Sequence, residues 1–537
     1  MNYDPTFIPY HSMRYPIYAS HGMVAASSPQ ASAAGLDIMR HGGNAVDAAV
    51  ATAAALTVVE PTANGIGSDA FALVWIEKDQ RLYGLNGSGW APMTLTLAAA
   101  REASVNGKMP THGWTPTMVP GAPGAWAALS SRFGRLPLSR TLAPAIEYAR
   151  DGYPASPNLA RAWSGSIDHF TRNLKGPEYA EWFNTFASDG ELHAGSRVCL
   201  LNHARTLELI GESNAEAFYR GELAERIVED SNEFGGFFSN EDFSDYAPSW
   251  VEPISVHYRG YDVCEIPPNG QGIVALMALN ILKEFMFTHR ESSDAFHTQW
   301  EAMKIAFADG LGHVTDPKAM RVSYDDLIKP SYGALRAGEI GPSAKSYTAA
   351  LPPKSGTVYF CAADGEGNMV SMIQSNYMGF GSGIVVRGTG ISLQNRGHDF
   401  SLDPSDVNCV APRKKTYHTI IPGFLMKDGK AVGPFGVMGG YMQPQGHVQV
   451  VTNLIDYHMN PQQALDAPRW QWMRDDRMTV ESSFNPEIAS QLVRRGHKVD
   501  VTLNHTAFGR GQIILRSEDD ALVGATEGRT DSNIACW

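Results

Sequence analysis

The pattern of hydrophobic and polar positions changes in blocks along the chain, from helical spacing to strand-like alternation and back. Small apolar residues at helical spacing fill 28–60, with a serine–proline start at Ser28 and a break at Gly42. The segments 69–78 and 81–88 then alternate like two paired strands. Such mixed blocks predict a layered α/β protein rather than an all-α or all-β one.

Later blocks continue this alternation. We expect helices at 138–152, through most of 156–250, and at 269–285, 292–314, 448–457 and 485–496, and strands at 252–268 and in much of the chain after 357. The stretch 329–356 is rich in Pro, Gly and Ser and is the best linker candidate. The small apolar run 48–59 is too short to span a bilayer, so it predicts a buried helix and no membrane partner.

The segment 357–375 predicts a β-hairpin, because two β-rich runs flank the turn sequence DGEGN. Pairing residue 363 with 369 places Thr357 opposite Ser375. Cross-strand Cβ atoms lie about 4.5–5.5 Å apart, which lets two hydroxyls hydrogen-bond. Such pairs are also common in ordinary sheets, so the pairing alone does not distinguish catalysis from packing.

A glycine directly before the threonine favours catalysis. Gly356 adds no Cβ that would obstruct attack of the Thr357 hydroxyl on its carbonyl, as an N-to-O acyl shift requires. Hydrolysis of the resulting ester would free the α-amine of Thr357. That amine has an unperturbed pKa of about 7.7–8.0 and is a suitable general base for the same residue's hydroxyl.

A second candidate element is the glycine pair Gly439 and Gly440, which follows a predicted strand and precedes a predicted helix. Backbone N–H groups in that position can face a developing negative charge. A plain tight turn is the alternative interpretation.

Composition narrows the function classes. The net charge of −13 and the absence of a basic stripe argue against a nucleic-acid partner. The five cysteines are scattered without a C-x-x-C pair, which predicts reduced thiols. The first 20 residues lack the basic start and apolar core of a secretory signal, so we expect a cytoplasmic protein.

Competing catalytic signatures are missing from the sequence. It contains no G-x-S-x-G elbow, no H-E-x-x-H zinc motif and no Walker A loop. The stretches GIGSDA and GQGIVA fit G-x-G-x-x-A, but neither follows a clear strand in a βαβ unit. We therefore expect neither a cofactor nor a metal.

These residues resemble the γ-glutamyltransferase (glutathione hydrolase) family of N-terminal-nucleophile hydrolases over nearly the whole chain. The likeness is carried in order by GMVAASSPQASAAGLDIMRHGGNAVDAA, VVEPTANGIG, VPGAPGAWAALSSRFGRLPL, APAIEYARDGYP, GTVYFCAADGEGNMVSMIQS, FGSGIVV, GGYMQPQGH and ALDAPRW. The resemblance implies a four-layer αββα sandwich. It also implies one precursor cut between Gly356 and Thr357 into a large subunit, 1–356, and a small subunit, 357–537, which together form one composite domain.

The resemblance also implies roles for individual residues. Thr357 matches the nucleophile, Ser375 the hydroxyl residue that supports it, and Gly439 and Gly440 the oxyanion-hole glycines. Asp399 matches the aspartate that holds the glutamyl α-amino group. The candidate substrate-binding residues are completed by Tyr377, Arg396, His418 and Thr419.

Three departures from the family pattern affect the substrate. Ser88 stands where the family has an arginine that binds the substrate α-carboxylate, and serine offers at best one weak donor. Arg396 is either a replacement carboxylate binder or a surface-turn arginine. His418 and Thr419 replace a pair of serines, and His418 is either a packed histidine or an acid–base group. The segment between Phe400 and Lys414 is shorter than in lidded enzymes, which predicts an open pocket.

The sequence thus predicts a self-cleaving threonine amidohydrolase that acts on a small-molecule amide through an acyl-Thr357 intermediate. Glutathione or another γ-glutamyl amide is the first substrate hypothesis. A non-glutamyl amide, as in the family's oxamate amidohydrolase and cephalosporin acylase members, is the second. An inactive binding or scaffold homologue is the third, and assembly into a homo-oligomer stays open.

Overall fold

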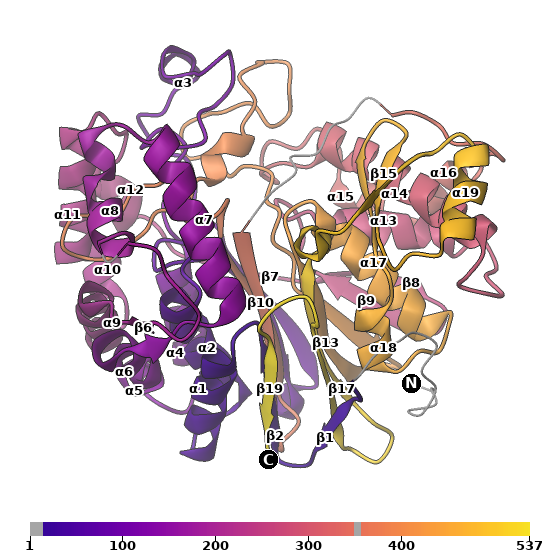
Figure 1. Cartoon of the computed structure of the whole chain (residues 1–537), viewed down its shortest axis with the longest axis horizontal. Helices are drawn as coiled ribbons and strands as arrows, with labels where there is room; N and C mark the ends of the chain where they lie inside the picture. Colours follow the sequence, from indigo (N-terminus) through magenta and orange to yellow (C-terminus); the bar gives the residue numbers. More distant parts are fainter. Residues whose placement is uncertain (1–13, 189, 348–355) are drawn as a thin grey trace.

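The computed structural model describes residues 14–188, 190–347 and 356–537. Two seven-stranded antiparallel sheets pack face to face, and helices cover the outer face of each (Figure 1). The predicted αββα sandwich is therefore confirmed. No helix in these ranges is long and apolar enough to cross a membrane.

The first sheet carries the predicted hairpin at its centre. Its strand order is β19-β2-β10-β11-β3-β4-β7. The bounds are β2 Gly22–Ala26, β3 Asp69–Ile76, β4 Arg81–Gly87, β7 Ser249–Val251, β10 Gly356–Asp364, β11 Met369–Tyr377 and β19 Asn533–Cys536. Every residue of β3, β10 and β11 is buried, as expected for central strands covered on both faces.

The second sheet has the order β1-β18-β17-β13-β12-β9-β8. Its strands are β1 Ile17–Ala19, β8 Ile254–Tyr258, β9 Tyr261–Glu265, β12 Gly423–Lys427, β13 Lys430–Met438, β17 Arg510–Arg516 and β18 Leu522–Thr526. Between the two sheets lies an apolar core that includes Phe71, Trp75, Tyr359, Phe424 and Ile514. Each sheet supplies alternate side chains to this layer, so the two sheets hold each other in register.

Helices on the outer face of the first sheet come mostly from the first half of the chain (Figure 1). They are α1 Pro29–Arg40, α2 Ala45–Val59, α4 Ala122–Phe133, α5 Leu138–Thr141, α6 Ala143–Asp151, α7 Pro157–Asn173, α8 Ala180–Phe186, α9 Leu201–Ser213, α10 Glu216–Arg220, α11 Glu222–Glu233 and α12 Asn240–Ser244. Helix α3 Leu97–Glu102 lies apart from this layer, at the top of Figure 1, and packs in a small separate apolar cluster. All of α2 is buried, and its Asn44–Asp47 capping box starts it. The buried helix predicted from 48–59 is confirmed.

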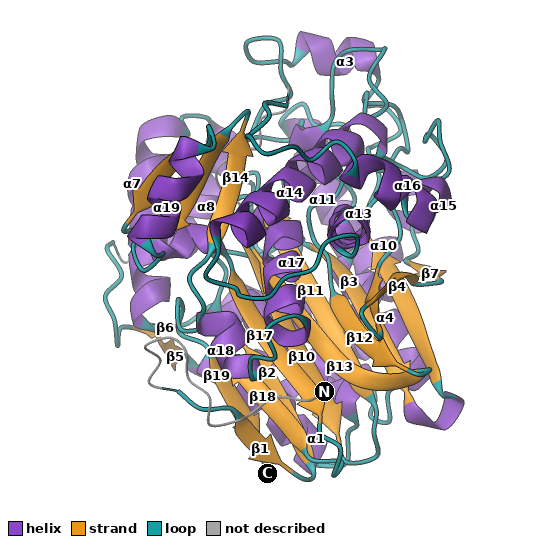
Figure 2. Ribbon diagram, turned by 90° about the vertical axis from the view of Figure 1, so that its right-hand side faces the viewer, coloured by secondary structure: helices purple, strands orange, loops and turns teal. Residues whose placement is uncertain are grey.

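The outer face of the second sheet is covered by later helices, and Figure 2 shows α17 lying across its strands. They are α13 Gly272–Leu282, α14 Ser293–His313, α15 Tyr324–Leu327, α16 Pro330–Ala337, α17 Met442–Ile455, α18 Pro461–Asp466 and α19 Pro486–Arg494. Beside them, β14 Trp470–Arg474, β15 Arg477–Glu481 and β16 Lys498–Thr502 form a small sheet. These strands agree with the expectation of strands in much of the chain after 357, whereas α18 was not predicted.

The linker candidate 329–356 is only partly confirmed. Its first third forms α16, with Pro330 in the first turn, where proline favours a helix start. Further on, the Lys304 ammonium donates to the carbonyl of Lys345 at 3.0 Å and to Glu301 Oε1 at 2.7 Å. A buried ion pair thus anchors the segment before the hairpin. Residues 348–355 of the candidate lie outside the described residues.

Replacing Lys304 by methionine should destabilise the protein by about 3–5 kcal/mol, because Glu301 would be left as a buried, unpaired carboxylate. Both side chains are 0% exposed. Differential scanning calorimetry should show a clearly lower unfolding midpoint. Removing both charges, as Lys304→Met with Glu301→Leu, should recover most of that loss, and an unchanged midpoint in the single variant would contradict this assignment.

The same cluster has the spacing of a metal site. His297, Glu301 and His497 bring their ligand atoms within 4.8 Å of one another. The Lys304 ammonium, however, lies 2.7 Å from Glu301 Oε1 and 3.4 Å from His497 Nδ1. His497 Nε2 in turn lies 2.8 Å from His297 Nδ1. The Lys304 ammonium therefore already contacts Glu301 and His497, two of the three side chains that a metal ion would need as ligands.

Candidate active site

The hairpin that carries Thr357 forms with the predicted register. Ala363 pairs with Met369, and the ladder continues to Val358 and Gln374. The register shifts by one residue between Gly356 and Val358, which is a bulge next to the candidate nucleophile. The Oγ atoms of Thr357 and Ser375 lie 3.0 Å apart, both fully buried.

Ser375 links the nucleophile to the carbonyl before it. Its hydroxyl donates to the Gly356 carbonyl at 2.8 Å and accepts from the Tyr377 N–H at 2.8 Å. Because a carbonyl oxygen can only accept, the single Ser375 hydroxyl proton points toward Gly356, and Thr357 is then the donor in its contact with Ser375. The hydroxyl that would attack and the carbonyl that it would attack therefore share one hydrogen-bonding partner.

Arg396 lies inside this cluster rather than on the surface. It is 1% exposed, so the surface-turn interpretation is wrong. Its Nη1 donates to Thr419 Oγ1 at 2.7 Å and its Nη2 to Ser375 Oγ at 3.4 Å, and the guanidinium lies 4.1 Å from the centre of the Tyr377 ring. Its Nε has no hydrogen-bond partner among the described residues. The guanidinium thus keeps a donor for a ligand.

Asp399 ends the short 3-10 helix Arg396–Asp399 and has one engaged oxygen. Tyr377 donates its phenol proton to Oδ1 at 2.6 Å. Oδ2 is buried, lies 3.9 Å from Arg396 Nη1, and accepts no hydrogen bond from the described residues. Burial raises the pKa of Asp399, although Arg396 and the phenols of Tyr377 and Tyr441 oppose that shift. An unpaired buried carboxylate oxygen beside a cation is a natural contact for a charged ligand.

The predicted glycine turn connects β13 to α17. Gly439 and Gly440 have φ values of 139° and 59°, a region that favours glycine. Within the described chain neither N–H donates to a backbone or side-chain acceptor. The Gln271 amide donates to the carbonyls of Gly440 at 2.8 Å and Thr419 at 2.7 Å. One side chain thus ties the glycine turn to the Arg396 cluster.

His418 is buried and paired with a residue that the sequence analysis did not select. Its Nε2 lies 2.9 Å from Asp69 Oδ2, with both side chains 1% exposed. Burial, with the cations Arg396 and Lys415 nearby, holds the pKa of His418 well below its usual range. Its ring also packs on Phe71 at 4.8 Å. These contacts favour a packed, neutral histidine over an acid–base group.

Ser88, which the resemblance places where the family has an arginine, is buried and hydrogen-bonded. Its hydroxyl donates to Asn86 Oδ1 at 2.7 Å and lies 3.4 Å from Asn269 Oδ1. It therefore supplies no cation to the cluster. Arg396 is the guanidinium that contacts both Ser375 and Thr419.

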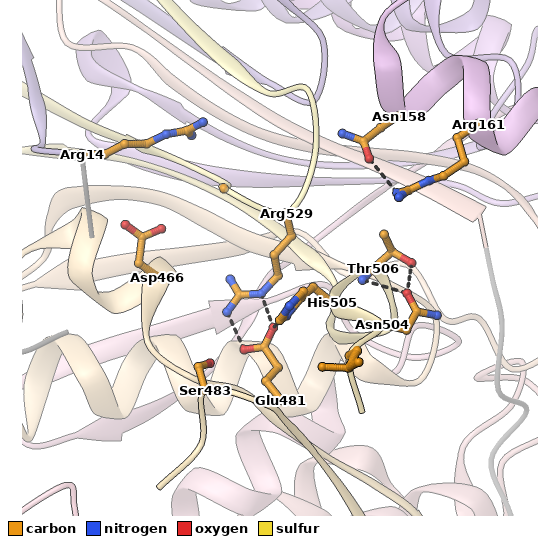
Figure 3. Close-up of a pocket in the computed structure, with 12 residues that line it drawn as sticks. Arg14, Asn158, Arg161, Asp466, Glu481, Ser483, Asn504, His505, Thr506 and Arg529 are labelled. Atoms are coloured by element: carbon orange, nitrogen blue, oxygen red, sulfur yellow. Dashed lines mark hydrogen bonds and ion pairs between the residues drawn. The ribbon is translucent and has the colours of Figure 1, made fainter. Parts of the chain in front are cut away.

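A cavity of about 540 Å³ lies elsewhere on the boundary between the predicted subunits (Figure 3). It is lined by Asn158 and Arg161 of α7 and by small-subunit residues that include Glu481 and Arg529. Arg529 is engaged by Glu481 and Glu527, and Arg161 donates to Asn158. None of the predicted site residues lines it.

The short segment between Phe400 and Lys414 does not leave the Thr357 side chain exposed, so the open pocket stays a prediction.

Comparison with known proteins gives these residues a family context. The family model described as gamma-glutamyltranspeptidase matches residues 31–537. The chain belongs to the gamma-glutamyltranspeptidase family. The resemblance stated from the sequence motifs is thereby confirmed, together with the expectation of an amide-hydrolysing enzyme.

Relatives in this family carry several different substrate names. A glutathione hydrolase-like proenzyme of Bacillus subtilis, YwrD, is 36% identical over 97% of this chain and 99% of its own length. An oxamate amidohydrolase proenzyme of Klebsiella pneumoniae is 32% identical over 96% of this chain and 98% of its own. The crystal structure of a cephalosporin acylase from Bacillus halodurans has 55% identity and a TM-score of 0.95, covering 100% of this chain and 99% of that one. The Bacillus subtilis and Klebsiella pneumoniae relatives are both named as proenzymes, that is, precursors.

Proposed function

We propose that this chain is a precursor that cuts itself between Gly356 and Thr357 and then hydrolyses small amides through an acyl-Thr357 ester. The hydrogen-bonded group of Thr357 Oγ1, Ser375 Oγ and the Gly356 carbonyl carries the proposal. The products would be the predicted large subunit, 1–356, and small subunit, 357–537. The names of the proenzyme relatives agree with it.

Self-cleavage follows from this arrangement. Thr357 Oγ1 attacks the Gly356 carbonyl carbon, and the Ser375 hydroxyl stabilises the resulting oxyanion. The C–N bond breaks, the threonine nitrogen takes the hydroxyl proton, and an ester links Gly356 to Oγ1. Water hydrolyses the ester, which leaves a carboxylate on Gly356 and a free α-amine and hydroxyl on Thr357.

Turnover uses the new amine. It accepts the Oγ1 proton while Oγ1 attacks the substrate amide carbonyl, and the N–H groups of Gly439 and Gly440 stabilise the oxyanion. The leaving amine takes the proton, and water then hydrolyses the acyl-Thr357 ester. The positive φ of both glycines supports this role, because such backbone can turn consecutive N–H groups toward one point.

The acyl group of the substrate should carry a carboxylate. Arg396 is buried, has one weak ion pair at 3.9 Å, and keeps a free Nε donor. A γ-glutamyl group would place its carboxylate on Arg396 and its ammonium on Asp399 Oδ2. We take γ-glutamyl amides as the first candidate substrates on this basis.

A second candidate, a carboxylate-bearing acyl group without an ammonium, is favoured by one observation. Tyr377 occupies Asp399 Oδ1, which leaves a single oxygen close to the Arg396 cation for an incoming ammonium. The oxamate amidohydrolase and cephalosporin acylase relatives show that the family is not confined to glutathione hydrolases.

The variant Asp399→Asn separates the two candidates. If the ammonium binds Asp399, kcat/KM for γ-glutamyl 4-nitroanilide should fall by about a hundredfold, while glutaryl 4-nitroanilide, which lacks the ammonium, should be hydrolysed as before. The second candidate would be supported if wild type preferred the glutaryl compound and if Asp399→Asn hydrolysed both compounds at the wild-type rate. Release of glutamate, oxalate and ammonia from glutathione and oxamate should be measured alongside.

A further inference from the structure

A buried aspartate lies opposite Ser375 in the first sheet. In the first sheet Asp69 of β3 is the cross-strand partner of Ser375, which in turn contacts Thr357. Asp69 is 1% exposed, and nothing in the chemistry proposed above uses it. Because an ionised carboxylate is costly to bury, its presence there calls for a function.

The partners of Asp69 define its protonation state. Its Oδ1 accepts from the Gly89 N–H at 3.1 Å, and its Oδ2 lies 2.9 Å from His418 Nε2. The other ring nitrogen, Nδ1, accepts from the Ile420 N–H at 3.4 Å. The histidine proton therefore belongs on Nε2, and because each Asp69 oxygen then accepts from an N–H group, this arrangement favours the ionised carboxylate.

His418 in turn holds the backbone on which Thr419 lies. Its N–H donates to the Asn269 carbonyl at 2.9 Å, and its carbonyl accepts from the Gln271 N–H at 2.9 Å. The next residue, Thr419, accepts from Arg396 Nη1 at 2.7 Å. The carboxylate of Asp69 is thus connected, through His418 and Thr419, to the cation proposed to bind the substrate.

We propose that Asp69 and His418 are a positioning pair that sets the orientation of Arg396 through Thr419, and so determines how well the enzyme binds a carboxylate on the acyl group. The inference rests on the proposed function. Neither residue contacts the reacting hydroxyl, so the pair acts through Arg396. The resemblance expects a substrate-binding arginine at the position of Ser88. Arg396, which comes from a different segment, takes that role, and the pair holds its guanidinium in place before the substrate binds.

Charge around Asp69 supports the inference and gives it a pH dependence. Arg396, Lys415 and His418 face the carboxylate, as do the phenols of Tyr219 and Tyr246. Burial raises the pKa of Asp69 to about 7 against the lowering effect of Arg396, the Gly89 N–H and Lys415. As pH falls through about 7, Asp69 gains a proton on an oxygen that already accepts from an N–H group, its hydrogen bond with His418 weakens, and carboxylate binding should weaken.

The test compares two substrates with the same leaving group. Asp69→Asn should raise KM for glutaryl 4-nitroanilide by roughly ten- to a hundredfold and leave kcat/KM for the uncharged butyryl 4-nitroanilide unchanged. Wild type should show a rise in the glutaryl KM below about pH 7, and the variant should show no such rise. Titration of the Thr357 amine affects both substrates equally, so the ratio of their rates isolates Asp69.

A second variant keeps the test decisive if Asp69→Asn fails to fold. Thr419→Val, which removes only the oxygen that accepts from Arg396, should give the same carboxylate-specific loss, and Thr419→Ser should restore the preference. The double variant should lose no more than either single one, because both act through Arg396. Equal losses for the two substrates, or additive losses, would overturn the inference. Failure of wild-type self-cleavage would instead contradict the proposed function itself.

Discussion

Replacing Thr357 by alanine should leave the chain uncut and inactive. Purified wild type should give two fragments on a denaturing gel, whereas the variant should run as one band near 58.4 kDa. Amide hydrolysis should fall by on the order of 10⁵-fold or more, because both the nucleophile and the α-amine that activates it are lost. The buried contact of this hydroxyl with Ser375 is the structural reason.

Thr357→Ser is the matched control, since it keeps a hydroxyl after Gly356. It should still cut itself and retain measurable hydrolysis. A wild-type protein that stays a single band and hydrolyses no amide would support the inactive-homologue interpretation. An uncut Thr357→Ala chain with full activity would place the nucleophile elsewhere.

Replacing Ser375 by alanine should slow self-cleavage by about 10²–10³-fold, the usual cost of removing one oxyanion donor. Its hydroxyl is the group that donates to the Gly356 carbonyl and also contacts Thr357. A time course of fragment formation after translation in a cell-free system would give the rate directly.

Ser375→Thr preserves the hydroxyl and should process faster than the alanine variant. Tyr359→Phe serves as a matched control outside the group, because its phenol bonds to Ser371, which pairs with Cys361 further along β11, and not to Gly356. If the alanine variant processed at the wild-type rate, the Gly356 carbonyl would have to be activated by another donor.

The sequence predicted those parts of the site that depend on local pattern. The hairpin register followed from its turn, and so did the approach of Thr357 to Ser375. The glycine pair between a strand and a helix was equally visible, because positive φ at consecutive positions favours glycine. The helices at 29–40 and 45–59 formed where caps and breaks indicated.

Long-range contacts in the site were not predictable from one sequence. Asp69 lies in an apolar strand with no local sign that His418, 349 positions later, would be its partner. Gln271 lies at the start of a predicted helix and in a weak dinucleotide motif, and neither pattern indicates that it joins Thr419 to Gly440. The one local signal was the residue type: a charged or amide side chain such as Asp69 or Gln271 among apolar positions indicates a buried polar group that needs a partner.

Burial of Arg396 depends on the same kind of contact. Nothing in its neighbourhood along the chain distinguishes a turn arginine from one enclosed by Tyr377, Ser375 and Thr419. The enclosing groups come from β11 and from the segment before β12, which meet only when the two sheets pack.

The reaction with a slow amide substrate can be stopped during turnover and the small fragment analysed by mass spectrometry. This measurement tests both the identity of the nucleophile and the position of the cut. The N-terminal peptide should begin at Thr357 and carry the mass of the acyl group, which should vanish when substrate is exhausted. A fragment that starts at another residue, or one that stays unmodified while acid product accumulates, would contradict the account.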